Sequence, residues 1–178
     1  KSSSLEAQIS SISDDIAYNN HDIQDGIKAK LFKLNDLLEI NFFKDIYKSH
    51  KKKIKRKNND ILIYQIIRDS INLMVKDLIK NTIINLKTEK IKSVNDVYAH
   101  KKQLVSFSNK FKEIESEVRY FLRLKMYDNK SVQIKNNKGK KIIKKLFLVI
   151  NKNPKKFLSN DQMTFNKHRA ISDYISGM

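Results

Sequence analysis

The chain has 178 residues, and its 37 basic and 19 acidic residues give a net charge of +18. Its length favours one domain, and the absence of cysteine excludes disulfides, thiolate metal sites and cysteine nucleophiles. It has no run of the roughly 20 uncharged apolar residues that a membrane-spanning helix needs, and three glycines and one proline are too few for an all-β fold.

The first third of the sequence has the apolar periodicity of helices. Apolar residues recur at steps of three, four or seven over Leu5–Leu34, which predicts one long amphipathic helix. Asn35-Asp36 ends that pattern. A second apolar segment covers residues 36–48, and the basic run Lys51–Lys57 follows it.

The longest predicted helix lies in the middle of the sequence. Asn58-Asn59-Asp60 is a good helix start, and residues 61–86 are apolar on more than one side, as is typical of a central helix in a bundle. The next segment, residues 87–108, is irregular. Its expected helix caps are Ser93 and one of the two serines Ser106 and Ser108.

Two further helical patterns follow. The first covers Asn109–Met126 and is broken by Asp128-Asn129. The second covers residues 132–150 and is most regular in its latter half, so a turn at residues 136–139 between two short elements stays open as an alternative.

The last pattern predicts a helix over Asp161–Ile175, after Asn153-Pro154 closes the preceding segment. Arg169 and Asp173 fall on its polar side. No internal repeat and no sustained heptad pattern is present. The sequence therefore predicts an all-α fold.

The positive charge is weak evidence for a nucleic-acid partner. Of the basic residues, 32 are lysine and five are arginine, and Lys, Ile and Asn together supply 74 residues. Their A/T-rich codons are a sufficient cause of this excess, whereas nucleic-acid surfaces favour the forked guanidinium of arginine. Most of the charge is therefore interpreted as a solvated surface.

The acidic start of the chain is more informative. Residues 1–26 carry a net charge of −4. Within them Asp14, Tyr18 and Asp22 are spaced by four residues and lie along one stripe of the predicted helix, beside its apolar face. Such a stripe could bind a divalent cation and sugar hydroxyls. Composition alone favours the alternative, an ordinary acidic face paired with lysines, and both interpretations stay open at this point.

The segment over residues 5–26, LEAQISSISDDIAYNNHDIQDG, resembles a signature of the deoxyguanosine triphosphate triphosphohydrolases, which are HD-domain dNTP triphosphohydrolases. Four later segments resemble that family in the same order: residues 68–79 with the Met-x-x-Asp-x-Ile pattern, Phe107-Ser108, Phe121-Leu122 with Met126-Tyr127, and Asp173–Met178. The likeness covers nearly all of the chain.

This resemblance implies an HD-domain-like helical bundle. Residues 1–50 would be the C-terminal end of its catalytic core, and residues 51–178 the C-terminal helical region of the same enzyme. It implies a cytoplasmic, homo-oligomeric enzyme that uses Mg²⁺ or Mn²⁺ and hydrolyses a dNTP, dGTP above all, to a deoxynucleoside and triphosphate. Family members can also bind single-stranded nucleic acid.

The resemblance also assigns roles to individual residues. Asp14 matches the most distant of four metal ligands, and Tyr18 and Asp22 match positions that hold the deoxyribose and its 3′-hydroxyl. Tyr127 matches a tyrosine under the sugar, where a 2′-hydroxyl would clash. Arg119 matches a basic position near the substrate phosphates.

The sequence departs from the family pattern because the other three metal ligands, a His and a His-Asp doublet, are absent. His21-Asp22 does not match that doublet. We therefore expect the chain to be the C-terminal part of such an enzyme and to be inactive alone, since one carboxylate does not hold a catalytic metal in water. The alternatives are a basic helical nucleic-acid-binding module and an inactive remnant.

Overall fold

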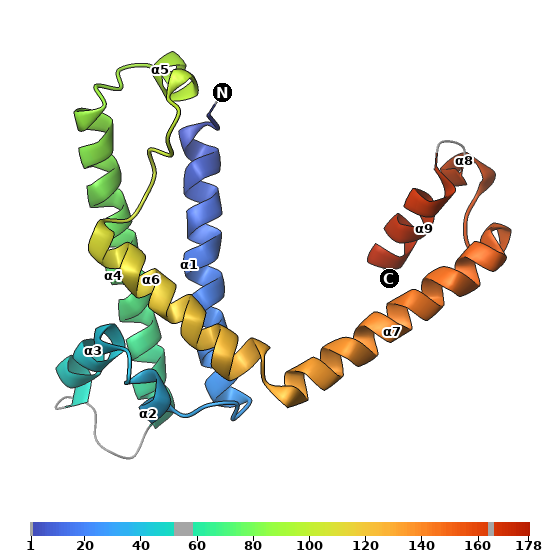
Figure 1. The fold of residues 1–178 in the computed structure, drawn as a ribbon, viewed down its shortest axis with the longest axis horizontal. Helices are drawn as coiled ribbons and strands as arrows, with labels where there is room; N and C mark the ends of the chain where they lie inside the picture. The colour runs from blue at the N-terminus through green and yellow to red at the C-terminus, as the bar shows by residue number, and fades with distance from the viewer. Residues whose placement is uncertain (1, 52–58, 164–165) are drawn as a thin grey trace. The chain divides into compact units, whose positions relative to one another are not determined.

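The computed structural model describes residues 2–51, 59–163 and 166–178. Every regular element within those ranges is helical, which confirms the predicted all-α fold (Figure 1). The chain divides into two compact units, Lys1–Tyr127 and Asp128–Met178, each with its own core. The prediction that residues 1–50 and 51–178 form functionally distinct regions stays a prediction.

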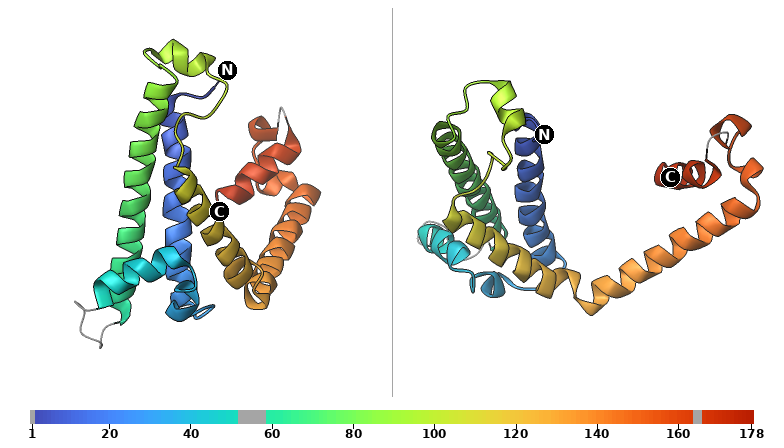
Figure 2. Two further views of the ribbon diagram at one scale, coloured as in Figure 1. Left: turned by 60° about the vertical axis from the view of Figure 1, so that its left-hand side comes forward. Right: turned by 45° about the horizontal axis from the view of Figure 1, so that its top comes forward.

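The first unit is built around two long helices, α1 and α4, which lie side by side (Figures 1 and 2). Helix α6 packs against α1, and α3 packs against α4. The elements of this unit are α1 Leu5–Lys28, α2 Leu34–Leu37, α3 Asn41–Lys51, α4 Asn59–Thr88, α5 Val94–Ala99, α6 Asn109–Leu122 and the π-helical turn η1 Arg123–Tyr127.

Helix α4 is apolar on more than one side, as the sequence indicates. Its inner side buries Ile66 and Met74 in the core of the first unit. On the same helix Tyr64, Ile79 and Ile83 are exposed. Helix α4 therefore packs against both α1 and α3 through its buried side. Its exposed apolar side chains are not covered by any other part of the described chain.

Helix α1 is shorter than predicted, because it ends at Lys28 rather than near Leu34. Lys30 adopts a left-handed conformation with φ of 57°, and the Leu31 N–H donates to the Gly26 carbonyl at 2.9 Å. Such a reversal closes a helix C-terminus. The apolar residues after Lys28 continue the helical period by coincidence and instead fold back onto the core, as the buried Phe32 does.

The close approach of Phe32 to Gly26 predicts a cost for any side chain at that glycine. A Cβ atom at position 26 would lie 2.2 Å from the Phe32 ring, which is itself buried and packed edge-on against Phe121. We expect Gly26→Ala to lower the free energy of unfolding by about 1–2 kcal/mol in urea denaturation. Gly139→Ala is the control, since a Cβ there meets no atom within 4 Å. An unchanged unfolding midpoint for Gly26→Ala would contradict this packing.

The remaining predictions for the first unit are largely confirmed. The apolar segment 36–48 divides between α2 and α3, and the basic run after Lys51 lies outside the described residues. Ser93 caps α5 and Ser108 caps α6 through their hydroxyls. Of the two serines left open by the sequence, Ser108 is therefore the cap.

The second unit comprises α7 Lys130–Lys152, the 3₁₀ turn η2 Pro154–Lys156, α8 Asn160–Met163 and α9 Lys167–Ser176. Helix α7 is continuous through residues 136–139, so the alternative of a turn there is wrong. The Asn129 side chain caps its first turn, and Gly139 is accommodated within the helix. The single predicted helix over 161–175 is two helices, and Arg169 pairs with Asp173 on the surface of α9 at 2.9 Å.

Candidate functional site

Three of the five predicted site residues meet where α1 approaches the end of α6. Tyr18 and Asp22 stand one turn apart on α1, and Tyr127 closes the π-helical turn η1. The Tyr127 hydroxyl donates a short hydrogen bond to an Asp22 carboxylate oxygen. Asp22 and Tyr127 are half-buried, whereas Tyr18 is 60% exposed. We call these three residues the tyrosine–aspartate cluster.

The environment of Tyr127 keeps its hydroxyl protonated. Burial raises the pKa of the Tyr127 phenol well above its ordinary value, and the hydrogen bond to the Asp22 carboxylate and its charge raise it further. Tyr18 adds a smaller contribution in the same direction. The phenol is therefore a fixed donor at neutral pH, and the carboxylate keeps a second oxygen with which to accept from a ligand hydroxyl.

Asp14 lies one turn before Tyr18 on the same helix and is exposed. The expectation that the acidic residues border the core therefore fits Asp22 better than Asp14. In the ranges that the structure describes, no three His, Asp or Glu side chains gather into a group that could hold a metal ion. Asp14 can supply one carboxylate ligand, which does not make a metal site by itself.

Arg119 lies on α6 and faces α1. Its Nη2 is 3.1 Å from an Asp15 carboxylate oxygen, and its Nε pairs with Glu115 one turn earlier on α6. The guanidinium thus lies between two carboxylates, beside the helix that carries Asp14 and Tyr18. A phosphate that binds Arg119 would share it with these acids. Asp15 was not among the predicted site residues, although its position next to Asp14 signals its proximity.

The segments that carry the family resemblance bond to one another in the folded chain. The buried Asn20 amide donates to the Met74 sulfur at 3.6 Å, which joins the first segment to the second. The Asp77 carboxylate accepts from the Ser108 N–H and hydroxyl, both at 2.8 Å. With Tyr127 bonded to Asp22, these contacts tie the tyrosine–aspartate cluster to the core of the first unit.

A polar ladder on α4, absent from the sequence interpretation, fixes the irregular segment that leads into α6. Its side chains are spaced by four residues: Asp77, Asn81 and Asn85 lie on α4, and Glu89 follows directly after its last residue. Asn81 donates to the Ser106 carbonyl and Asn85 to the Leu104 carbonyl, each at 2.8 Å. The signal that could have found it is this spacing of short polar side chains on an otherwise apolar helix.

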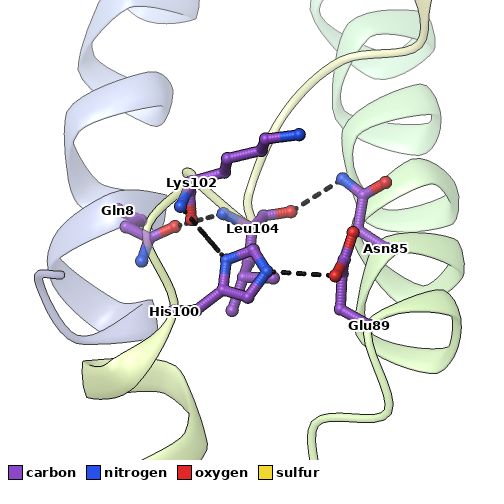
Figure 3. Close-up of polar contacts among 6 residues, drawn as sticks. All are labelled: Gln8, Asn85, Glu89, His100, Lys102 and Leu104. Atoms are coloured by element: carbon purple, nitrogen blue, oxygen red, sulfur yellow. Dashed lines mark hydrogen bonds and ion pairs between the residues drawn. The ribbon is translucent and has the colours of Figure 1, made fainter.

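The same segment is held from its other side by α1. The buried Gln8 amide oxygen accepts from the N–H groups of Leu104 and Val105, at 2.9 and 3.1 Å. Figure 3 shows Leu104 between Gln8 and Asn85, with one partner on each long helix. The segment therefore bridges α1 and α4 and sets where α6 begins.

His100 lies in the same irregular segment, four residues before Leu104. Its contacts predict that the stability of the fold depends on pH. Its imidazole bonds to the Lys102 carbonyl at 2.9 Å and to the Glu89 carboxylate at 3.2 Å (Figure 3). The Lys102 bond, followed by that to Glu89, raises the pKa of His100 above its ordinary value. The stabilisation by these bonds is complete below about pH 6.5, the pKa of a histidine in the unfolded chain. It is lost as the pH rises through the higher pKa that His100 has in the folded chain.

We therefore expect the urea concentration at the midpoint of unfolding to be higher for wild type than for His100→Gln at pH 5.5. The difference between the two midpoints should be smaller at pH 8.5. The measurement is a paired urea denaturation series across that range. Glu89→Gln should reduce the same difference, because it removes the charge that faces the imidazole. A difference that grows with pH would contradict the assignment.

None of the described helices is long and apolar enough to cross a membrane. Residues 105–178 match the family described as the phosphohydrolase-associated domain. The chain is 70% identical over 177 residues to the deoxyguanosinetriphosphate triphosphohydrolase-like protein of Pelagibacter ubique, an alignment that covers 99% of this chain and 48% of that protein.

More distant relatives carry the same name. Those of Rickettsia typhi and Leptospira interrogans are 36% and 38% identical over 98% of this chain, and over 47% and 48% of their own lengths. The chain thus spans about half the length of the curated relatives that it matches.

Proposed function

Because this chain is related along nearly its whole length to the deoxyguanosinetriphosphate triphosphohydrolase-like proteins, we propose that it is the C-terminal part of a metal-dependent dNTP triphosphohydrolase. Its proposed substrate is dGTP, and the complete enzyme is proposed to be a homo-oligomer. The chain alone is proposed to be inactive, and its share of the reaction is to hold the deoxyribose.

The observation that carries this proposal is the tyrosine–aspartate cluster. A protonated phenol fixed on a carboxylate leaves one carboxylate oxygen free to accept from the sugar 3′-hydroxyl. The Tyr127 ring supports the sugar at the position where a 2′-hydroxyl would clash. Tyr18 is exposed and is free to contact the same sugar. The arrangement selects a deoxynucleotide by fit and by hydrogen bonding together.

The metal belongs to the complete enzyme. Asp14 is proposed as the ligand that this chain supplies, and Arg119 as a basic contact to the phosphates. The described residues do not by themselves fit a divalent cation, because no three His, Asp or Glu side chains among them gather into a group that could hold one. No step of the reaction is therefore assigned to this chain beyond holding and orienting the substrate.

The test is release of inorganic triphosphate from dGTP in the presence of Mn²⁺. The chain alone is expected to give none above the rate without protein. Robust turnover by the purified chain alone would overturn the proposed division of the active site.

A second candidate function is a basic helical module for single-stranded nucleic acid. It is favoured by α7, which contains eight lysines and no acidic residue. Such binding would weaken steeply with salt, in proportion to the number of phosphates contacted. A gel-shift series in rising salt beside the triphosphate assay distinguishes the two functions, since hydrolysis does not require this affinity.

A further inference from the structure

The helical turn that carries Tyr127 into the tyrosine–aspartate cluster is not α-helical. Helix α6 ends at Leu122, and the next five residues, Arg123–Tyr127, form the π-helical turn η1. In such a turn, hydrogen bonds between residues five apart replace the α-helical bonds between residues four apart, so the turn holds one residue more. Single π-helical turns are rare and occur frequently at functional sites.

The spacing of the buried side chains changes where η1 begins. Helix α6 faces the core of the first unit with residues at α-helical steps of three and four, namely Ile114, Val118, Phe121 and Leu122. In η1 the residues that pack against the same core are Met126 and Tyr127. They follow Phe121 and Leu122 by five positions each, which is the interval of a π-helical turn.

A regular α-helix over the same residues would present different side chains to the core. Successive residues of an α-helix are about 100° apart. Lys125 follows Phe121 by four residues and would lie about 40° from it, on the buried side. Tyr127 follows Leu122 by five residues and would lie about 140° from it. Its hydroxyl would then lose the bond to Asp22.

The cost of the regular helix falls on Lys125. In the structure its side chain is 41% exposed, and its Nζ lies 3.8 Å from a carboxylate oxygen of Asp36 in α2. An ion pair at this distance and exposure stabilises a protein little by itself. Turned to the buried side, the ammonium would lose water among the apolar side chains of the core, and the cost of burying an unpaired charge is large. Keeping this charge out of the core is therefore the larger effect.

We propose that Lys125 is a positioning residue for the sugar site. Its charge disfavours the regular α-helix and so holds η1 in the π-helical arrangement, which places Tyr127 against Asp22. This rests on the proposed function and deepens it, because it names what sets the position of the ring that selects a deoxyribose. The positioning itself is a property of this chain and is measured on this chain alone.

The first variant is Lys125→Leu, in which an apolar side chain can take the core position, so that Tyr127 is expected to leave Asp22. Ionisation of Tyr127 is followed by NMR of ring-labelled tyrosine, and its signal is the one missing from Tyr127→Phe. In wild type, burial and Asp22 raise the pKa of this phenol, so it should stay protonated at about pH 10, where lysine is still mostly charged. In Lys125→Leu about half of it should be ionised there, because the ordinary pKa of tyrosine is about 10.

Two controls isolate the charge at position 125. Lys125→Arg keeps the charge and should keep Tyr127 protonated at the same pH. Lys112→Leu removes an exposed lysine of α6 outside η1 and should also leave Tyr127 unchanged.

Deletion of Leu124 from the Lys125→Leu protein is the rescue. Tyr127 then follows Leu122 by four residues, about 40° on a regular helix, so its protonation should return. Deletion of Leu124 from wild type should keep Tyr127 protonated for the same reason, and this variant needs no apolar residue at position 125.

A folded Lys125→Leu protein in which Tyr127 stays protonated would overturn the proposal, with folding checked by circular dichroism at the same pH. So would a folded deletion variant in which Tyr127 ionises like an ordinary tyrosine. The sugar role is tested separately, in this chain mixed with the portion of the Pelagibacter ubique relative that it does not match. If Lys125→Leu frees Tyr127 and the mixture still prefers dGTP over GTP as wild type does, the positioning role stands and the sugar role proposed for Tyr127 fails.

Discussion

Tyr127→Ala is expected to abolish most of the preference for dGTP over GTP in the complemented enzyme. By that term we mean this chain together with the portion of the Pelagibacter ubique relative that this chain does not match. Removing the ring removes both the surface under the sugar and the obstacle to a 2′-hydroxyl. The ratio of kcat/KM for dGTP to that for GTP should fall at least about tenfold.

Two matched variants separate the roles of the ring and the hydroxyl. Tyr127→Phe keeps the ring and loses the bond to Asp22, so it should lower turnover of dGTP while preserving most of the discrimination. Tyr120→Ala removes an exposed tyrosine of α6 that lies outside the cluster and should leave the ratio unchanged. A Tyr127→Ala enzyme that folds and still rejects GTP as wild type does would contradict the role proposed for this residue.

Gln8→Ala is expected to have the largest effect on stability of any single change considered. It removes the acceptor of two buried N–H groups, those of Leu104 and Val105, and leaves both without their partner. An unsatisfied buried donor costs about 1–3 kcal/mol, so the free energy of unfolding should fall by about 2–5 kcal/mol. Urea denaturation followed by circular dichroism measures it.

Gln103→Ala is the control for that change, because Gln103 is exposed in the same segment. It should shift the unfolding midpoint little. A Gln8→Ala protein as stable as wild type would show that the segment is held to α1 by other contacts. The expected loss also matters for function, since this segment sets the start of the helix that carries Arg119 and leads to Tyr127.

The features of the fold that sequence predicts best are those decided by local chemistry. Serine hydroxyls cap helices from within a few residues, so the sequence identified Ser93 as a cap and narrowed the cap of α6 to Ser106 or Ser108, of which the structure has Ser108. The end of α1 was not recognisable, because Lys30 takes a left-handed conformation that its residue type does not announce. There the packing of Phe32 against Gly26 decides where the helix ends.

The site shows the same division between local and long-range information. Helical spacing alone places Asp14, Tyr18 and Asp22 on one stripe of α1. It cannot join them to Tyr127, which lies 105 positions further along the chain than Asp22. The resemblance to the triphosphohydrolases supplied that residue, and the fold brings it into contact with Asp22. The roles of these residues in binding a sugar stay predictions.

The polar ladder of α4 shows why other contacts were missed. Asn81 and Asn85 on a helix predict only exposed polar positions, because nothing nearby in the sequence names their partners. Those partners are backbone carbonyls of a segment about 20 residues away. An irregular segment has no periodicity, so its path becomes visible only in the folded chain.

Triphosphate release by the complemented enzyme tests the central claim most directly. With dGTP and Mn²⁺, this chain and the complementary portion should each be inactive alone, and mixing them should restore turnover that saturates as one is titrated with the other. Asp14→Ala in this chain should abolish the restored activity, whereas Asp25→Ala on the same helix should retain it. Restored activity that is indifferent to Asp14, or a folded mixture that stays inactive, would contradict the claim that this chain completes the active site.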